Sequence, residues 1–214
     1  MTRVLIAPDK FKGSLTAADV CAAVGRGLHR HASVTVTSCP VADGGDGTIA
    51  AALAAGYSEV PVTASGPTGL PVCTHYARRG DTAVVELADV SGLVRLPGER
   101  LEPLTATSRG TGEVMAAAID AGCTQLVLGI GGSASTDGGA GMLSALGARL
   151  RGRNGTELPD GGASLASLAS LELSSLTARM DGVTLTVACD VDNPLTGPNG
   201  AAAVYGPQKG AAAT

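Results

Sequence analysis

Aromatic residues are almost absent from this sequence of 214 residues, which has no tryptophan, one phenylalanine and three tyrosines. Apolar residues still make up 44% of it, so the core must consist of alanine, valine and leucine, with 31 glycines allowing close packing and tight turns. No apolar run reaches membrane length, and the N-terminal run ends at Pro8 and Asp9, which is too short for a secretory signal. We therefore expect a cytoplasmic protein of one large or two small domains.

Excess positive charge is also lacking. The formal net charge is -4 and the 15 lysines and arginines are scattered, which argues against a nucleic-acid-binding surface. The five cysteines form no CxxC pair and show no metal-ligand spacing, so we expect small buried hydrophobic side chains in a reducing compartment. They are Cys21, Cys39, Cys73, Cys123 and Cys189.

Several nucleotide-binding motifs are missing. The sequence contains neither GxxxxGK[ST] nor the HRD and DFG motifs, which argues against a P-loop protein and a protein kinase. An NAD-binding Rossmann domain would place GxGxxG after its first strand, where this sequence has "DKFKG". An NAD or nucleotide-sugar binding module therefore stays only as an alternative.

The first 56 residues alternate predicted strands and helices. The apolar runs 3–8 and 33–41 are typical of buried strands. Between them, Thr16 and Asp19 form a possible capping box, and apolar residues then recur every four positions, which predicts a helix. The turn "ADGGDGT" leads into the alanine-rich helix 49–56. This order favours a parallel sheet with crossover helices.

The pattern changes between residues 57 and 105, where turn signals separate strand-like runs and no helix-length pattern occurs. After residue 106 the alternation of strands and helices returns. It predicts helices 111–122 and 139–150, strands 125–132 and 183–193, and a leucine- and serine-rich helical patch up to Met180.

We therefore predict an α/β fold: a Rossmann-like parallel sheet domain from residues 1–56 and 106–214, with a strand-rich segment of a second α/β domain inserted at 57–105. The chain closes on a segment rich in glycine and proline followed by alanines. We expect the first domain to be incomplete at its C-terminus, with a frayed natural terminus as the alternative.

Charged and polar residues follow the predicted strands, where ligands bind in open parallel sheets. They are Asp9, Lys10 and Lys12 after the first strand, Asp43 and Asp46 after the second, and Asp190, Asp192 and Asn193 after the last. We expect them at one edge of one sheet, a rim suited to a phosphorylated ligand and a metal ion. A solvated pair is the alternative for the two lysines.

The stretch "GGSASTDGG", residues 131–139, lies between a predicted strand and a predicted helix. Its glycines allow backbone N–H groups to turn toward an anion, its hydroxyls add donors, and the helix start adds a partial positive charge. The candidate phosphate-binding residues are Gly131, Gly132, Ser133, Ser135, Gly138 and Gly139. Asp137 either caps the helix or binds Mg²⁺.

Other candidates have two interpretations each. Arg109 in "SRGTGE" is a possible anion clamp, unless the segment only begins a helix. The three histidines, His29, His31 and His75, are expected at the surface rather than as bases. Asp190 and Asp192 are close enough to need a cation or solvent between them.

Taken together, six blocks resemble the glycerate kinase family of bacterial type. They are "APDKFKGSLTA", "PVADGGDGT", "ELADVSGL", "TSRGTGE", "GIGGSASTDGGAGM" and "ACDVDNPLTGPNGAAAVYGPQKGA", in family order over nearly the whole chain. The resemblance implies a Rossmann-like domain with an inserted α/β domain, and transfer of the γ-phosphoryl group of ATP to D-glycerate with Mg²⁺. Family members continue beyond "GPQKGA", so an inactive fragment is an alternative.

The resemblance also implies roles for individual residues. The loop 131–139 would bind phosphate, and Lys10, Lys12 or Lys209 would neutralise the moving phosphoryl group or the glycerate carboxylate. Asp190 and Asp192 would bind Mg²⁺, and Asp43 or Asp190 would accept the proton of the substrate hydroxyl. The product is expected to be 2-phosphoglycerate, with 3-phosphoglycerate as the alternative.

Overall fold

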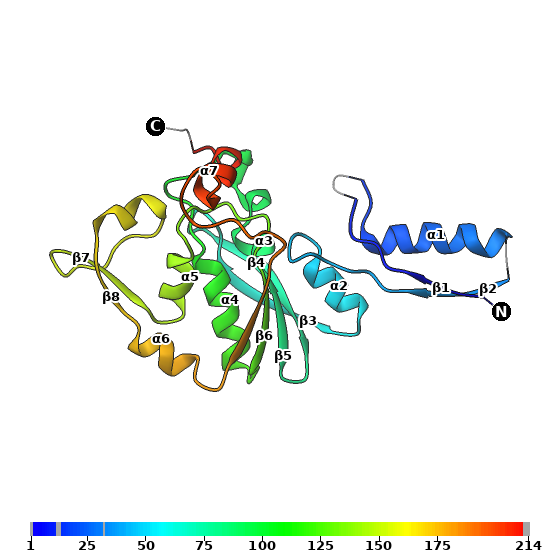
Figure 1. The fold of residues 1–214 in the computed structure, drawn as a ribbon. Coiled ribbons are helices and arrows are strands. Elements are labelled where there is room, and N and C mark those ends of the chain that lie inside the picture. Colours follow the sequence, from blue (N-terminus) through cyan, green and yellow to red (C-terminus); the bar gives the residue numbers. More distant parts are fainter. Residues whose placement is uncertain (1, 12–13, 32, 212–214) are drawn as a thin grey trace.

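The computed structural model describes residues 2–11, 14–31 and 33–211. It is a mixed α/β structure whose strands form three sheets, of five, two and two strands (Figure 1). None of the helices in these ranges is both long and apolar enough to cross a membrane.

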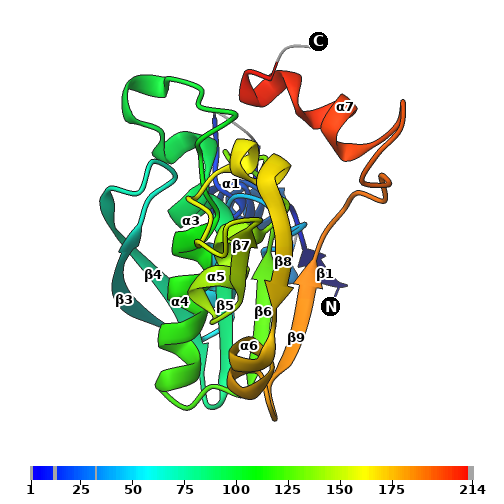
Figure 2. The same ribbon diagram turned by 90° about the vertical axis from the view of Figure 1, so that its left-hand side faces the viewer.

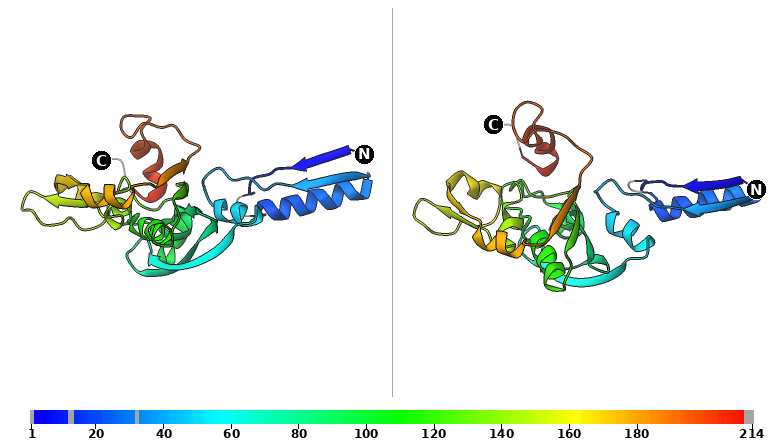
Figure 3. Two further views of the ribbon diagram at one scale, coloured as in Figure 1. Left: turned by 90° about the horizontal axis from the view of Figure 1, so that it is seen from below. Right: turned by 60° about the horizontal axis from the view of Figure 1, so that its bottom comes forward.

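The N-terminal strands form a unit of their own. Strand β1 (Thr2–Ile6) pairs in parallel with β2 (Val34–Ser38), and α1 (Ala17–His31) connects them. The predicted capping box is confirmed: Thr16 Oγ1 donates to the Asp19 carboxylate at 2.6 Å, and the Asp19 N–H donates to Thr16 Oγ1 at 3.1 Å. This unit projects from the rest of the protein in the views of Figures 1 and 3.

The later strands form a second, mixed sheet in the order β3-β4-β5-β6-β9. Pairing is antiparallel from β3 to β5 and parallel from β5 to β9. The expectation of one sheet that includes the first two strands is therefore wrong, and β3 to β5 share their sheet with β6 and β9. The domain boundaries near residues 57 and 105 stay a prediction. The bounds are β3 (Ser58–Ser65), β4 (Pro71–Arg79), β5 (Thr82–Glu86), β6 (Gln125–Gly129) and β9 (Thr184–Ala188).

Alternation along the central strands produces two apolar faces, because successive side chains point to opposite sides of a sheet. In β5, Val85 packs in the main core under α4 (Arg109–Asp120), whereas Val84 packs under α2 (Thr48–Ala54). Figure 2 shows α4 lying along the sheet with α5 (Ala140–Ala145) beside it. The main core also contains Tyr76, Val114, Met115, Ala118, Leu126 and Leu128.

The segment from residue 146 to 180 differs from the prediction. Helix α5 is only six residues long, and β7 (Arg149–Gly152) pairs antiparallel with β8 (Leu168–Glu172). Gly147 has a φ of 114°, which a helix cannot continue through. The predicted helix to residue 150 and the helical patch are thus wrong, apart from α6 (Ser174–Arg179) and a 3-10 helix at Gly162–Ser167. Short apolar runs do not distinguish strands from helices by period alone.

Short helices lie near the carboxyl ends of the central strands. They are α3 (Leu87–Ser91), α7 (Ala201–Tyr205) and the 3-10 helices Leu93–Arg95, Pro97–Glu99 and Pro207–Lys209. The expectation of buried cysteines is correct for Cys21 and Cys123 but wrong for Cys39, Cys73 and Cys189, which are exposed.

Candidate functional site

Two glycine-containing loops meet where β6 and β9 end. The Gly131 N–H donates to the Gly44 carbonyl at 3.0 Å, so the loop after β6 lies against the loop that follows β2. The Gly44 backbone also lies so close to Ala188, the last residue of β9, that a Cβ at Gly44 would be 2.3 Å from its carbonyl oxygen. The segments after β2, β6 and β9 therefore come together, although β2 belongs to another sheet.

Lys10 and Asp43 form an ion pair on this loop. Lys10 Nζ lies 3.2 Å from Asp43 Oδ1 and 3.4 Å from the Asp9 carboxylate. The Gly45 N–H, which donates to Asp43 Oδ1 at 2.9 Å, lowers the pKa of Asp43, and Lys10 adds to this effect. Burial lowers the pKa of Lys10, but Asp43 and Asp9 outweigh it and raise that pKa on balance. Both groups are therefore charged at neutral pH. The predicted site residue Lys12 lies outside the described residues.

Glu86, at the end of β5, anchors the same loop and was not identified from the sequence. Its buried carboxylate accepts the N–H groups of Gly47 at 3.1 Å and Ile49 at 2.9 Å, where α2 begins. Burial raises the pKa of Glu86, and the nearby Asp89 and Asp46 add to this, against the lowering effect of the two N–H groups. No spacing in the sequence marks this contact, because 37 to 39 residues separate the partners.

The raised pKa of Glu86 predicts a pH dependence of stability. A carboxyl group whose pKa is higher in the folded state contributes stability that is full below its unfolded pKa, about 4.3, and is lost as pH rises through the folded pKa. Glu86→Gln should remove this contribution. As pH rises from the unfolded pKa of Glu86 through its folded pKa, the unfolding free energy of the variant should therefore fall less than that of the wild type. Urea unfolding at a series of pH values measures both slopes, and parallel curves would contradict the assignment.

Lys209 contacts the middle of the glycine loop 131–139, at Ser133 and Ser135. Its Nζ donates to Ser133 Oγ at 2.5 Å and to the Ser135 carbonyl at 2.7 Å. Burial lowers the pKa of Lys209, and the charge of Asp137 opposes this. The structure thus brings a predicted cation into contact with two predicted phosphate-binding residues, 74 and 76 residues away in the sequence.

Asp137 is buried, with 1% of its surface exposed. Its oxygens accept hydrogen bonds from the N–H and hydroxyl of Ser108 and from the N–H groups of Gly139 and Gly141. These are the contacts of a carboxylate that caps helix starts, the first of its two predicted interpretations. Mg²⁺ would have to compete with four protein donors, so Asp137 does not fit a metal ligand.

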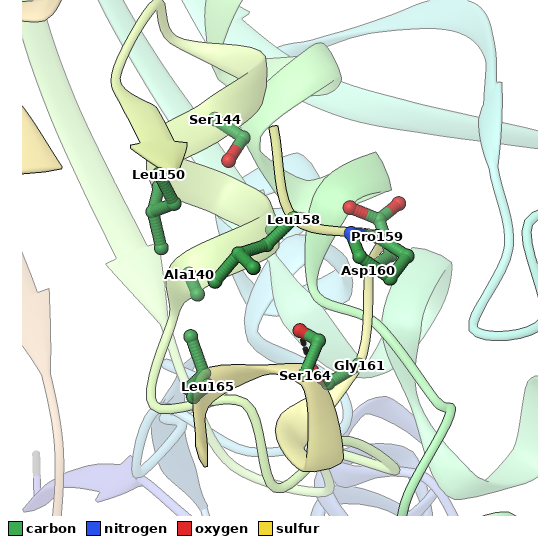
Figure 4. Close-up of a pocket in the computed structure, with 10 residues that line it drawn as sticks. Ala140, Ser144, Leu150, Leu158, Pro159, Asp160, Gly161, Ser164 and Leu165 are labelled. Atoms are coloured by element: carbon green, nitrogen blue, oxygen red, sulfur yellow. Dashed lines mark hydrogen bonds between the residues drawn. The ribbon is translucent and has the colours of Figure 1, made fainter. Parts of the chain in front are cut away.

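Arg109 makes a two-point ion pair. Its Nε and Nη2 donate to the two Asp160 oxygens at 2.6 and 2.8 Å, and Asp160 raises the pKa of Arg109. Beside Asp160 lies a cavity of about 10 Å³, whose walls include Ala140 and Leu165 (Figure 4). This cavity is too small for a substrate. The edge of the guanidinium group that was expected to clamp an anion binds the Asp160 carboxylate instead.

Asp190 and Asp192 are exposed and follow directly after β9. Within residues 2–11, 14–31 and 33–211, no group of three or more histidine, cysteine, aspartate or glutamate side chains is arranged around a metal position. A Mg²⁺ ion needs only one or two carboxylates when phosphate oxygens and waters complete its shell. Two exposed carboxylates meet this requirement in number, whereas the Asn193 side chain bonds to the Asn199 carbonyl and the Tyr205 hydroxyl.

The two histidines whose side chains the structure describes, His29 and His75, give no base next to these loops. His29 is exposed, as expected for a surface residue. His75 is half-buried, and its Nδ1 lies 3.3 Å from Asp89 on the side of β4. The side chain of His31 lies outside the described part of the protein.

The comparisons with known proteins agree on one family. A sequence profile described as "Glycerate kinase family" matches residues 4–214. The chain is 48% identical to "Glycerate kinase" of Bacillus subtilis and 46% identical to "Glycerate 2-kinase" of Escherichia coli, over 99% and 98% of its length. These matches cover 56% of each relative.

A solved structure, a putative glycerate kinase 2 from Salmonella typhimurium LT2, superposes with a TM-score of 0.87 at 44% identity. The match covers 99% of this chain and 58% of that one, so the chain spans little more than half the length of its relatives. The profile, the sequence identities and the shared structure agree: the chain belongs to the glycerate kinase family.

Proposed function

We propose that this chain contributes the phosphate-binding side of an enzyme that transfers the γ-phosphoryl group of ATP to D-glycerate in the cytoplasm. The observation that supports this most is the meeting of the glycine loop 131–139 with the loop that holds Lys10 and Asp43. Phosphoryl transfer requires neutralised charge and in-line positioning, and little covalent chemistry. A charged lysine next to glycine backbone provides the first of these requirements.

In this mechanism Lys10 and Lys209 face the negative charge of the transferred group from opposite ends of the glycine loop. The N–H groups of residues 131–135 that are not used within the fold would bind phosphate oxygens. Arg109 has no direct part in the proposal, because Asp160 holds its guanidinium group. Asp137 likewise has no direct part: it accepts hydrogen bonds from the N–H groups of Gly139 and Gly141 and does not bind metal.

Asp190 is proposed as the proton acceptor for the glycerate hydroxyl. Asp43 is the weaker candidate, because a carboxylate with a lowered pKa is a poor base. Asp190 and Asp192 would hold Mg²⁺, directly or through water, and the ion would neutralise charge on the phosphate oxygens. The substrate hydroxyl is proposed to be the one at carbon 2, in line with the printed name of the Escherichia coli relative.

The position of the phosphate tests the proposal. A fusion in which residues 1–214 replace the matching part of the Escherichia coli relative is incubated with ATP, Mg²⁺ and D-glycerate, and phosphorus NMR should then show 2-phosphoglycerate. Accumulation of 3-phosphoglycerate would support the kinase activity and contradict the proposed hydroxyl. A folded fusion that forms neither product, while the Escherichia coli relative does, would contradict the proposed activity.

Asp190→Asn should lower turnover about 10²-fold, which corresponds to a loss of about 3 kcal/mol of transition-state stabilisation. Asp181→Asn is the matched control, because Asp181 is an exposed aspartate before the other end of β9. Steady-state rates should show this loss for Asp190→Asn and not for Asp181→Asn. An Asp190→Asn variant as active as the Asp181→Asn control would remove Asp190 from the mechanism.

A further inference from the structure

The carboxylate of Asp137 joins the starts of two helices. Its Oδ2 accepts the Ser108 N–H at 2.9 Å, the Ser108 hydroxyl at 2.8 Å and the Gly141 N–H at 3.2 Å, and its Oδ1 accepts the Gly139 N–H at 3.1 Å. Ser108 immediately precedes α4, and Gly139 immediately precedes α5. One negative charge thus faces the partial positive ends of both helices.

Ser108 extends this connection. Its hydroxyl donates to Asp137 and accepts the Met142 N–H at 3.0 Å. The helix starts approach so closely that a Cβ at Gly141 would lie 2.3 Å from Thr107 Oγ1. The position of Asp137 is therefore fixed from α4, an element buried in the main core, as well as from α5.

Asp137 is itself part of the glycine loop 131–139, which is also held at other points. The loop is held at Ala134, whose N–H donates to the Ser91 carbonyl at 3.0 Å, and at Ser133 and Ser135, which Lys209 contacts. The negative charge of Asp137 acts on Lys209 and favours its protonated form against burial. A change at Asp137 would act on the backbone of the loop and on the lysine above it.

We propose that Asp137 is a positioning residue: through Ser108 it fixes the glycine loop and the Lys209 ammonium group in the geometry that phosphoryl transfer needs. This inference rests on the proposed function, and it does not require Asp137 to touch a substrate or a metal ion. Errors of about 1 Å in such positioning cost on the order of 10²-fold in rate. The loss should appear in kcat, because the loop geometry matters most in the transition state.

Glu113→Gln provides the matched control. Glu113 is a half-buried carboxylate of this region, and like Asp137 it accepts the N–H and hydroxyl of a serine, here Ser65, at 2.6 and 3.0 Å. Its partner lies at the end of β3 and not on the glycine loop. Glu113→Gln therefore reports what the loss of a similar carboxylate does to the fold alone.

The test compares Asp137→Asn, Ser108→Ala and Glu113→Gln by steady-state kinetics and by amide hydrogen exchange of residues 131–142. We expect kcat to fall about 10²-fold in Asp137→Asn and at least tenfold in Ser108→Ala, with KM values within about threefold. Exchange of the loop amides should become faster in both variants, and both readouts should be nearly unchanged in Glu113→Gln.

An Asp137→Asn protein with kcat within threefold of the wild type would overturn the inference. If Asp137→Asn does not fold, Ser108→Ala decides, and an unchanged kcat in that variant has the same meaning. The variants are made in a fusion in which residues 1–214 replace the matching part of the Escherichia coli relative, and if this fusion has no activity with the wild-type residues, the proposed function fails. The exchange readout then decides separately, and unchanged loop protection in the variants would overturn the positioning role of Asp137.

Discussion

Turnover should fall roughly 10²–10³-fold when Lys10 is replaced by methionine, the range that follows removal of one stabilising group from a transition state. The methionine keeps much of the length of the side chain but removes the charge beside Asp43 and the glycine loop. Stability should change by less than about 1 kcal/mol, since Lys10 pairs with partly exposed carboxylates, and such pairs contribute little to stability. A large loss of rate with an intact fold separates catalysis from folding.

Arg179→Met is the control for this prediction. Arg179 forms a comparable ion pair with Asp120 at 2.9 Å, which joins the last residue of α6 to the last residue of α4. Its turnover should stay within about twofold of the wild type. Initial rates at saturating ATP and D-glycerate, together with urea unfolding, provide both comparisons. Equal rates for Lys10→Met and Arg179→Met would exclude Lys10 from the transfer step.

The second large effect is expected for Gly44→Ala. Gly44 has a φ of 91°, and a Cβ there would lie 2.3 Å from the backbone oxygen of Ala188. Alanine therefore combines backbone strain with a collision against the end of β9. The carbonyl oxygen and carbon of Ala188 that the Cβ would meet are backbone atoms, which cannot move aside as a flexible side chain can. We expect the variant to lose at least about 3 kcal/mol of unfolding free energy, or to move the loop that holds Asp43 and lose activity at least tenfold.

Gly56→Ala separates strain from collision. Gly56 has nearly the same φ, 89°, but no atom lies within 4 Å of the position of its Cβ. It should lose only the backbone term, about 1–2 kcal/mol, and keep its activity. Thermal unfolding and initial rates of the two variants measure the difference. Gly44→Ala and Gly56→Ala proteins of equal stability and activity would show that the loop does not need its close approach to β9.

Local parts of the fold could be predicted from the sequence because their signals are local. The capping pair of Thr16 and Asp19 predicted the start of α1, and the apolar runs predicted β1, β2, β6 and β9. Partner choice between strands was not predictable, because it depends on long-range packing. The strand β8 was missed for a related reason, since its pairing with β7 is specified by the partner and not by its own alternation.

For the site, the sequence predicted which residues collect near the loops better than what each of them does. The residues Lys10, Asp43, Ser133 and Lys209 do lie on the two loops or against them. Arg109 and Asp137 carry the expected charges, but each charge is used within the protein, by Asp160 and by the helix starts. Besides local contacts, this internal use depends on Ser108 for Asp137 and on Asp160 for Arg109, which lie 29 and 51 residues away and which no motif records.

The most direct test of the account is ADP release from ATP and Mg²⁺ with and without D-glycerate. It should be measured for residues 1–214 alone and for a fusion in which they replace the matching part of the Escherichia coli relative. The account predicts release by the fusion that depends on D-glycerate and is lost in its Lys10→Met variant. A folded fusion without glycerate-dependent release, beside an active Escherichia coli relative, would contradict the claim that these residues form part of a glycerate-phosphorylating site.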